Sequence, residues 1–449
     1  MSTLSYKLIF LLLSLCLSSA GQEVYRSGLP DVDASSVGVY IENLETGNVV
    51  FDVNGELPMT PASVTKLVTA ASVLQHVDTA YRYHTLFVAD GPVADGVLNG
   101  NIRIIPSGDP TLESCHFPDY AGVADSVANA MLDMGIRKVR GQIIVEAGTE
   151  TDFSIPFGWK DSDAVWPYGA GHHALNYKDN RVLLSMPSAT IEPAVPGVKI
   201  MRVKKRRGAP MVSRKPSDMT VTVCCGPKQR VRTNIANPSP EAAFAHAFRL
   251  SLNAHGIDVV GQNLGEQKGS GQTLYVHLSP SVVDILRSMM MRSDNLMAEA
   301  SLRLLAPGRS RADALNVEMQ TWVENGIDVG GMKINDGSGL SRSNAISPYV
   351  LADVLVWMLD NSQYVNEYIS MFPVAGVSGT LRSFLKGTDL EGRFVAKTGS
   401  VDGVQCYAGY LLNEYGMPTH VVVVMVNGFT CSRAVLKSSI EEMLLEKLL

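Results

Sequence analysis

The spacing of hydrophobic and polar positions changes along the chain. Near the N-terminus, the apolar runs 37–41 and 49–53 flank Glu45-Thr46-Gly47-Asn48, a spacing and turn chemistry that predict a β-hairpin. From 63 to 75, apolar residues recur at helical intervals instead. This stretch predicts a buried helix whose first turn begins near Ser63.

Further along, β-type and helical patterns alternate. Residues 83–145 contain short β-type runs, including a strand predicted at 141–145, and 150–240 are rich in Pro and Gly with few helical patterns. Helices are predicted at 121–134, 240–255, 284–305, 312–325, 348–359 and 433–448, and two apolar strands at 404–412 and 420–427. A chain of 449 residues is too long for one ordinary core, so two or three domains are expected.

The first twenty residues have the pattern of an export signal. Lys7 precedes the apolar stretch Leu8 to Leu17, and Ser18-Ser19-Ala20 supplies the small residues of a cleavage site. The apolar stretch is shorter than the ~20 residues that cross a bilayer. We therefore expect cleavage near Ala20, export to the periplasm, and membrane association that is at most peripheral.

The overall charge argues against nucleic acid as a partner. Lys and Arg number 38 against 44 Asp and Glu, a formal charge of −6, whereas phosphate binding requires a basic surface. One basic cluster interrupts this balance, and it is either a solvated face or a site for an anionic wall polymer. Its members are Arg202, Lys204, Lys205, Arg206, Arg207, Arg214 and Lys215.

Metal and cofactor chemistry has little support in the sequence. The cysteines contain no Cys-x-x-Cys pair, and His172-His173, the only adjacent histidines, are expected to be structural. The sequence also lacks a phosphate-binding loop, a His-Glu-x-x-His helix and a Gly-x-Ser-x-Gly elbow. No metal and no cofactor are therefore expected.

Three short motifs carry the candidate chemistry. Ser63-Val-Thr-Lys66 places a hydroxyl and an ammonium on one face of a helix start, where a lysine of lowered pKa can activate the serine. Ser293-Asp294-Asn295 lies between helical segments, and Lys397-Thr398-Gly399 precedes the two apolar strands. Singly they can be a helix start with a surface lysine, a helix cap, and a strand-edge lysine before a turn. Indeed, Ser383-Phe-Leu-Lys386 also matches the first motif, so only the ordered set is a strong signal.

With this ordered set, the sequence resembles the serine penicillin-binding proteins and β-lactamases, most closely the penicillin-binding-protein-4-like (class C low-molecular-mass) D-alanyl-D-alanine carboxypeptidases. The resemblance covers nearly the whole chain after the export signal. Further stretches that carry it are Gly108-Asp109-Pro110-Thr111-Leu112, Gly158-Trp159, Asn237-Pro238, Asp336-Gly-Ser-Gly-Leu-Ser-Arg342, Ala375-Gly376 and Gly379-Thr380-Leu381.

The resemblance implies a fold and a domain organisation. The fold class would be α/β (α+β), with a transpeptidase/β-lactamase-like catalytic domain that is discontinuous over 21–85 and 282–449. The long insertion at 86–281 would be mostly β and form one or two smaller domains, with an inner nested domain at about 175–235.

The resemblance also implies roles for individual residues. Ser63 would be the nucleophile, Lys66 its base, and Ser293 a relay of a proton to the leaving amine. The peptide would be bound by Asn295, Lys397, Thr398 and Gly399, and the backbone N–H groups of Ser63 and Ser400 would form the oxyanion hole.

A second set of residues is expected to recognise the substrate's side chain. Asp163, Tyr168 and Asp402 would receive the amine of a diaminopimelate-type residue, and Arg342 its carboxylate. The alternative is a surface with ordinary solvated charges.

The activity implied is hydrolysis of peptidoglycan stem peptides through an acyl-enzyme, with acylation by β-lactam antibiotics. The resemblance leaves open whether the enzyme also cuts cross-links as an endopeptidase. A β-lactamase is one alternative, but no Glu-x-x-x-Asn stretch lies between Asn295 and Lys397. A catalytically silent peptidoglycan-binding protein is another, and the three intact motifs argue against it.

Overall fold

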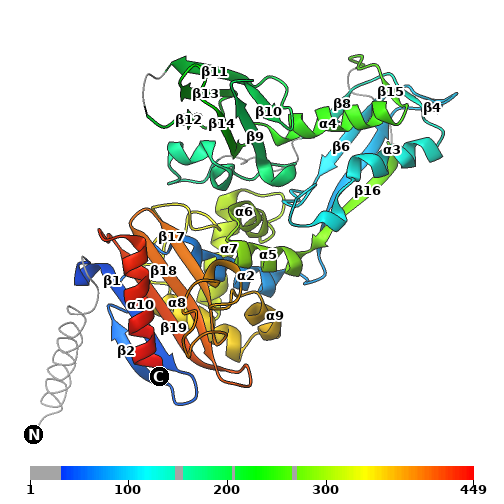
Figure 1. Ribbon diagram of the computed structural model, residues 1–449. Helices are drawn as coiled ribbons and strands as arrows, with labels where there is room; N and C mark the ends of the chain where they lie inside the picture. The colour runs from blue at the N-terminus through cyan, green and yellow to red at the C-terminus, as the bar shows by residue number, and fades with distance from the viewer. Residues whose placement is uncertain (1–31, 147–154, 205–207, 265–270) are drawn as a thin grey trace, which may run out of the picture. The chain divides into compact units, whose positions relative to one another are not determined.

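The computed structural model describes residues 32–146, 155–204, 208–264 and 271–449 (Figure 1). The expected export signal and residues 205–207 of the basic cluster lie outside these ranges. The chain divides into two compact units. The first comprises residues up to Gln75, Met289–Ser293 and Leu315–Leu449, and the second comprises His76–Ser288 and Asp294–Ala314. Within the described ranges, no helix is both long and apolar enough to span a membrane.

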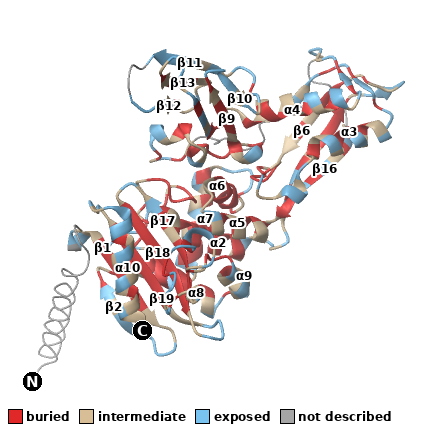
Figure 2. Ribbon diagram, in the orientation of Figure 1, coloured by how far each residue is buried: buried red, intermediate tan, exposed pale blue. Residues whose placement is uncertain are grey.

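A five-stranded antiparallel sheet forms the centre of the first unit (Figure 1). Its strand order is β17-β18-β19-β1-β2. The strands are β1 (Val37–Asn43), β2 (Asn48–Val53), β17 (Phe394–Val401), β18 (Val404–Leu412) and β19 (Pro418–Asn427). Strands β18 and β19 are buried over most of their length (Figure 2), which is why their sequences are continuous apolar runs.

Helices cover both faces of this sheet. Leu436, Ile440 and Leu444 of α10 join the hydrophobic core that includes Tyr407 of β18. Since neighbouring side chains alternate across a strand, Tyr410 points to the other face, where its hydroxyl donates to the Leu355 carbonyl of α8 at 2.8 Å. The helices that lie wholly or almost wholly in the first unit are α2 (Thr65–His76), α8 (Pro348–Asp360), α9 (Val365–Ser370) and α10 (Arg433–Leu448). Helices α5 (Val282–Arg292) and α7 (Arg311–Glu324) begin in residues of the second unit and end in residues of the first.

The second unit is built mainly of strands. Its largest sheet has the order β16-β3-β6-β8, and three smaller sheets have the orders β15-β7-β5-β4, β10-β9-β14 and β11-β13-β12. These strands share a hydrophobic core with α3 (Val123–Asp133) and α4 (Pro240–Ala254). The strands are β3 (Arg82–Asp90), β4 (Val93–Ala94), β5 (Val97–Leu98), β6 (Asn101–Pro106), β7 (Lys138–Val139), β8 (Ile143–Val145), β9 (Arg181–Met186), β10 (Thr190–Glu192), β11 (Lys199–Lys204), β12 (Met211–Ser213), β13 (Thr220–Cys225), β14 (Val231–Ala236), β15 (Asp258–Val259) and β16 (Gln272–Ser281).

Most predicted elements are confirmed, but the helix predicted over 284–305 is two helices. Helix α5 ends at Arg292, and α6 runs from Asn295 to Arg303. Ser293 lies between them with a left-handed φ of 60°. Asp294 caps α6 by accepting a hydrogen bond from the Met297 N–H at 2.9 Å. The polar tripeptide therefore separates two helices, as its position between helical segments indicated.

Two of the ordinary interpretations of basic residues are wrong. Lys397 is not at a strand edge before a turn, because it lies inside β17, which continues to Val401. Arg214, assigned to a solvated basic face, is buried and donates to the Ala164 carbonyl at 2.6 Å. Arg202, Lys204 and Lys215 are exposed, as that interpretation requires.

Candidate active site

Ser63 lies in a short 3-10 turn, Ala62–Val64, directly before α2. Ala62 is fully buried and adopts a left-handed φ of 48°. Two glycines allow other segments to approach this turn closely. A Cβ on Gly339 would collide with the Ala62 carbonyl, and one on Gly399 of β17 would lie 2.5 Å from the Pro61 carbonyl. The backbone around Ser63 is therefore held by close contacts from two segments.

Lys66 is fully buried one turn after Ser63. Its Nζ donates to Ser63 Oγ at 3.1 Å and to the Ser338 carbonyl at 2.6 Å. The three-residue spacing places both side chains on one face of the helix start. The interpretation of Lys66 as a surface lysine is therefore wrong, and its amine lies within reach of the serine hydroxyl.

Lys397 is a second fully buried lysine in the same unit. Its Nζ donates to Ser293 Oγ at 2.8 Å and to the Thr398 carbonyl at 2.7 Å. Burial, followed by the nearby Lys66 ammonium, holds the pKa of Lys397 well below its usual range. The three motifs of the sequence thus supply two hydrogen-bonded pairs, Ser63–Lys66 and Ser293–Lys397, and the charge of Lys66 acts on Lys397.

Ser293 occupies a backbone conformation that non-glycine residues seldom adopt. Its φ of 60° costs on the order of 1–3 kcal/mol, and such conformations concentrate at functional sites. Here the conformation accompanies the hydrogen bond from Lys397 to the Ser293 hydroxyl. Ser293 lies between α5 and α6, directly before Asp294, which caps α6.

Side chains of β17 alternate between the buried cluster and the other face of the strand. Lys397 and Gly399 are buried, whereas Thr398 is half-buried and Ser400 is exposed. Thr398 and Thr380 hydroxyls are hydrogen-bonded at 2.8 Å. Thr380 belongs to the Gly379-Thr380-Leu381 stretch that carried the resemblance, but no role was expected for it.

One important residue was missed by the sequence analysis. The fully buried Asp336 carboxylate accepts hydrogen bonds from the backbone N–H groups of Gly339 and Ser341, at 2.9 and 2.8 Å. It also accepts from Ser338 Oγ at 3.1 Å and from Asn344 Nδ2 at 2.6 Å. These bonds organise the loop that presents the Ser338 carbonyl to Lys66. The Asp-Gly-Ser-Gly-Leu-Ser-Arg stretch was the available signal, but only its arginine was given a role.

Three of the expected substrate-binding residues lie together in the second unit. Asn295 begins α6, and its side-chain amide donates to the Tyr168 carbonyl at 2.9 Å. The Tyr168 hydroxyl donates to Asp163 Oδ1 at 3.1 Å, and the Tyr168 side chain is 48% exposed. The backbone carbonyl and the side chain of Tyr168 therefore link Asn295 to Asp163.

The other two residues of the expected side-chain pocket lie in the first unit. Arg342 Nη1 donates to the backbone carbonyl of Asp402 at 2.7 Å. Arg342 is half-buried and Asp402 is exposed. The structure therefore holds the guanidinium beside Asp402 through the main chain.

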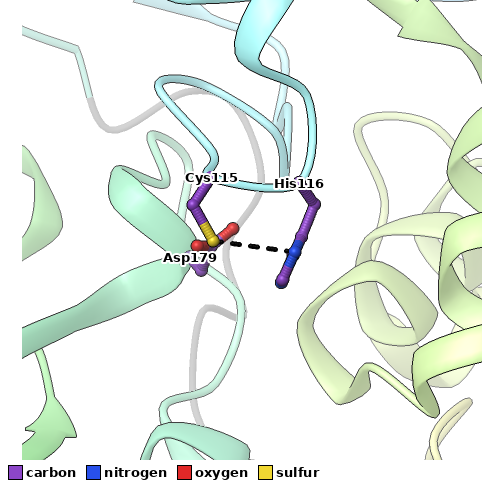
Figure 3. Close-up of side chains that lie close together, drawn as sticks. All are labelled: Cys115, His116 and Asp179. Atoms are coloured by element: carbon purple, nitrogen blue, oxygen red, sulfur yellow. Dashed lines mark hydrogen bonds between the residues drawn. The ribbon is translucent and has the colours of Figure 1, made fainter.

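A cluster of metal-ligand types lies elsewhere in the second unit (Figure 3). The ligand atoms of Cys115, His116 and Asp179 lie within 4.8 Å of one another, and Cys115 Sγ is 3.6 Å from His116 Nδ1. However, Arg181 donates to Cys115 Sγ at 2.6 Å and to Asp179 Oδ2 at 2.7 Å. Its guanidinium already supplies a positive charge to both groups, so this cluster alone does not support a metal site.

Comparisons with known proteins agree with the geometry. The model of the D-Ala-D-Ala carboxypeptidase 3 (S13) family matches residues 23–446. The D-alanyl-D-alanine carboxypeptidase DacB of Haemophilus influenzae is 26% identical over 424 residues, which are 89% of this chain and 86% of that protein.

Solved structures show the same fold. The crystal structure of penicillin binding protein 4 from Haemophilus influenzae matches with a TM-score of 0.82 and 25% identity, covering 95% of this chain and 99% of that one. A structure of the same protein complexed with a β-lactam has the same coverage, a TM-score of 0.76 and 24% identity. The expected mixed α/β fold class is thereby confirmed.

Proposed function

The chain belongs to the D-Ala-D-Ala carboxypeptidase 3 (S13) family, and from this premise we propose which of its residues carry out the reaction. It is a serine-type D-alanyl-D-alanine carboxypeptidase. We propose peptidoglycan stem peptides as its substrates and β-lactams as its acylating inhibitors. The β-lactam complex of the Haemophilus influenzae relative supports the second part of this proposal.

The observation that carries the mechanism is the contact between Lys66 Nζ and Ser63 Oγ at 3.1 Å. When the Lys66 amine is neutral, its lone pair can accept the hydroxyl proton as Ser63 Oγ attacks the carbonyl carbon of the penultimate D-Ala. The Ser338 carbonyl accepts a hydrogen bond from the same nitrogen and fixes its position. Two buried lysines that repel each other favour a state in which one of them is neutral.

The attack gives a tetrahedral oxyanion, for which we assign the backbone N–H groups of Ser63 and Ser400 as donors. As this intermediate collapses, the C–N bond to the terminal D-Ala breaks, and the leaving amine requires a proton. Ser293 is assigned to deliver it, and the hydrogen bond from Lys397 Nζ at 2.8 Å holds its hydroxyl in place. The proton that Lys66 accepted from Ser63 then replaces the one that Ser293 has given up. Water then hydrolyses the ester on Ser63 and releases the shortened peptide.

The terminal carboxylate of the substrate is assigned to Thr398, next to Lys397 on β17. The Thr398 hydroxyl donates to the Thr380 hydroxyl at 2.8 Å, and it would exchange this acceptor for the carboxylate when a peptide binds. A peptide bound at Thr398 and Gly399 would lie along β17 in the manner of an added strand, and the missing Cβ of Gly399 makes room for the Pro61 carbonyl of the Ser63 turn. Asn295 is assigned to the peptide amide, and its present partner is the Tyr168 carbonyl.

Two broader expectations also remain proposals. The signal-like pattern of residues 1–20 supports export to the periplasm and cleavage near Ala20. We also retain a catalytic domain over 21–85 and 282–449, with an insertion at 86–281 and a nested domain near 175–235. The strand-rich composition of the second unit supports a mostly-β insertion.

Release of D-Ala from a synthetic stem peptide, with benzylpenicillin labelling followed by intact-mass spectrometry, tests this function. We expect wild type to release D-Ala and to form one penicilloyl adduct on Ser63. Ser63→Ala should lose both, whereas Ser383→Ala, in the second Ser-x-x-Lys match, should retain both, because Ser383 accepts bonds from half-buried Lys437 instead. Rapid penicillin turnover without D-Ala release would indicate a β-lactamase, and neither reaction would indicate a silent binding protein.

A further inference from the structure

The outer edge of β17 is covered along only part of its length. Strand β17 ends the sheet of the first unit, and the segment 373–375 pairs with its first residues. The Ala396 N–H donates to the Pro373 carbonyl at 3.1 Å, and the Ala375 N–H donates to the Phe394 carbonyl at 2.9 Å. Among the described residues, no backbone pairing continues along this edge beyond Ala396, so the rest of the edge is open.

The open part of the edge belongs to the assigned substrate site. Because outward-facing groups alternate along an antiparallel strand, the N–H groups of Thr398 and Ser400 point the same way as that of Ala396. With the scissile carbonyl at the Ser400 N–H and the terminal carboxylate at Thr398, the C-terminal end of a bound peptide would face the covered part of the edge.

Thr380 lies at this junction. It is the central residue of the 3-10 turn Gly379–Leu381, which contacts β17. The Thr398 hydroxyl donates to the Thr380 hydroxyl at 2.8 Å, and among the described residues this is the only hydrogen bond of either hydroxyl. Thr380 is exposed and Thr398 is half-buried, so the pair is in contact with solvent.

The turn that carries Thr380 is fixed by its neighbours. Gly379 has a left-handed φ of 54°, and a Cβ at this position would lie 2.8 Å from the Met291 carbonyl of α5. Ser378, the preceding residue, accepts a hydrogen bond on its hydroxyl from the Val374 N–H at 3.0 Å. The position of Thr380 is therefore set by close contacts to α5 and to the segment that covers β17.

We propose that Thr380 is a positioning residue that aims the Thr398 hydroxyl at the terminal carboxylate of the substrate, an inference that rests on the proposed assignment of Thr398. A hydroxyl both donates and accepts. When the Thr398 hydroxyl turns to donate to the carboxylate, the Thr380 hydroxyl turns to donate to Thr398 Oγ1, and the bond between them is kept with its direction reversed. Each donation then polarises the next, which strengthens the bond to the carboxylate.

Hydrolysis of two peptides that differ only at the C-terminus tests this role. One ends in D-Ala-D-Ala with a free carboxylate, and the other is its C-terminal amide, which wild type should hydrolyse with a kcat/KM about 100-fold lower. Thr380→Val removes the hydroxyl at nearly constant volume, and it should raise KM for the free acid about tenfold, with kcat and the hydrolysis of the amide unchanged. Thr380→Ser keeps a hydroxyl and should restore the wild-type KM. The matched control Thr273→Val, on an exposed strand residue of the second unit, should behave as wild type.

Benzylpenicillin and its methyl ester provide a second readout, because the ester lacks the carboxylate. Thr380→Val should slow acylation by the acid about tenfold but leave acylation by the ester unchanged. Equal losses on acid and amide, a lower kcat with an unchanged KM, or a Thr380→Ser variant as impaired as Thr380→Val would each overturn the positioning role while D-Ala release by wild type still supported the proposed function. Wild type that hydrolysed neither peptide would overturn the proposed function, and this inference with it.

Discussion

Lys66 and Lys397 form a pair of fully buried lysines, and burial together with the Lys66 ammonium holds the pKa of Lys397 well below its usual range. Each nitrogen also contacts one of the two motif serines, Ser63 for Lys66 and Ser293 for Lys397. A change in the charge of either lysine therefore affects its repulsion with the other lysine and its hydrogen bond to one of the two serine hydroxyls of the proposed mechanism.

Lys66→Arg should lower the rate of penicillin acylation by about 10³-fold, because arginine stays protonated and cannot accept the Ser63 proton. In wild type, the acylation rate should rise with pH through a lysine pKa below the free value of about 10.4. Stopped-flow measurements with a fluorescent penicillin from pH 6 to 10 provide the check. Lys386→Arg, in the second Ser-x-x-Lys match, is the control and should behave as wild type; a flat wild-type profile would contradict the role of Lys66.

The lowered pKa of Lys397 also predicts a pH dependence of stability. Between its folded pKa and its unfolded value near 10.5, the folded state holds fewer protons on Lys397 than the unfolded state does. The free energy of unfolding of wild type should therefore rise with pH in this window relative to that of Lys397→Met. Below the folded pKa, the full destabilisation caused by the buried Lys397 charge should be present. Urea unfolding of both proteins at pH 7, 8 and 9 measures this difference. A difference that does not change with pH would be inconsistent with a lowered pKa.

Asp336→Asn should reduce the acylation rate by about 10²-fold, because an amide offers one acceptor oxygen where the carboxylate receives four hydrogen bonds. The Ser338 carbonyl would then be displaced from Lys66, and small displacements in an active site have effects of this size. Penicillin labelling kinetics, with thermal melting as a check on folding, provide the measurement. The exposed Asp328→Asn is the matched control, and a variant that is unfolded rather than slow would assign Asp336 to stability alone.

Asp163→Ala tests recognition of the substrate's side chain. If the carboxylate pairs with the amine of a diaminopimelate-type residue, wild type should cleave a peptide with a free side-chain amine faster than its acetylated counterpart, by about tenfold. The variant should lose this preference but keep penicillin acylation. Comparing kcat/KM for the two peptides measures the effect, and equal values in wild type would show that Asp163 does not read this group.

The order of the three motifs was the most informative property of the sequence. It indicated the correct family. Ser63, Ser293 and Lys397 come from segments that are far apart in the sequence, and Ser293 and Lys397 are hydrogen-bonded in the structure. The apolar strands β18 and β19 were predicted because their burial leaves a continuous apolar run. Strand β17 was missed, because the polar residues Lys397, Thr398 and Ser400 interrupt its apolar pattern.

Burial of charged groups was the property that the sequence concealed. Lys66, Lys397, Arg214 and Asp336 all resemble surface residues by type, and their partners are mostly backbone groups far away along the chain. A carbonyl such as that of Ser338 has no signature in the side-chain sequence. Hydrogen bonds of this kind become visible only when the loops are placed in space.

The left-handed conformation of Ala62, next to the nucleophile, has a consequence for the rigidity of this turn. Glycine adopts this conformation without strain, so Ala62→Gly would relieve the strain in the turn that carries Ser63. The same change would give the unfolded chain more freedom and loosen the backbone that carries Ser63. Ala62 therefore accepts backbone strain in the folded state and keeps the backbone of Ser63 rigid. Glycine at this position would exchange that rigidity for lower strain.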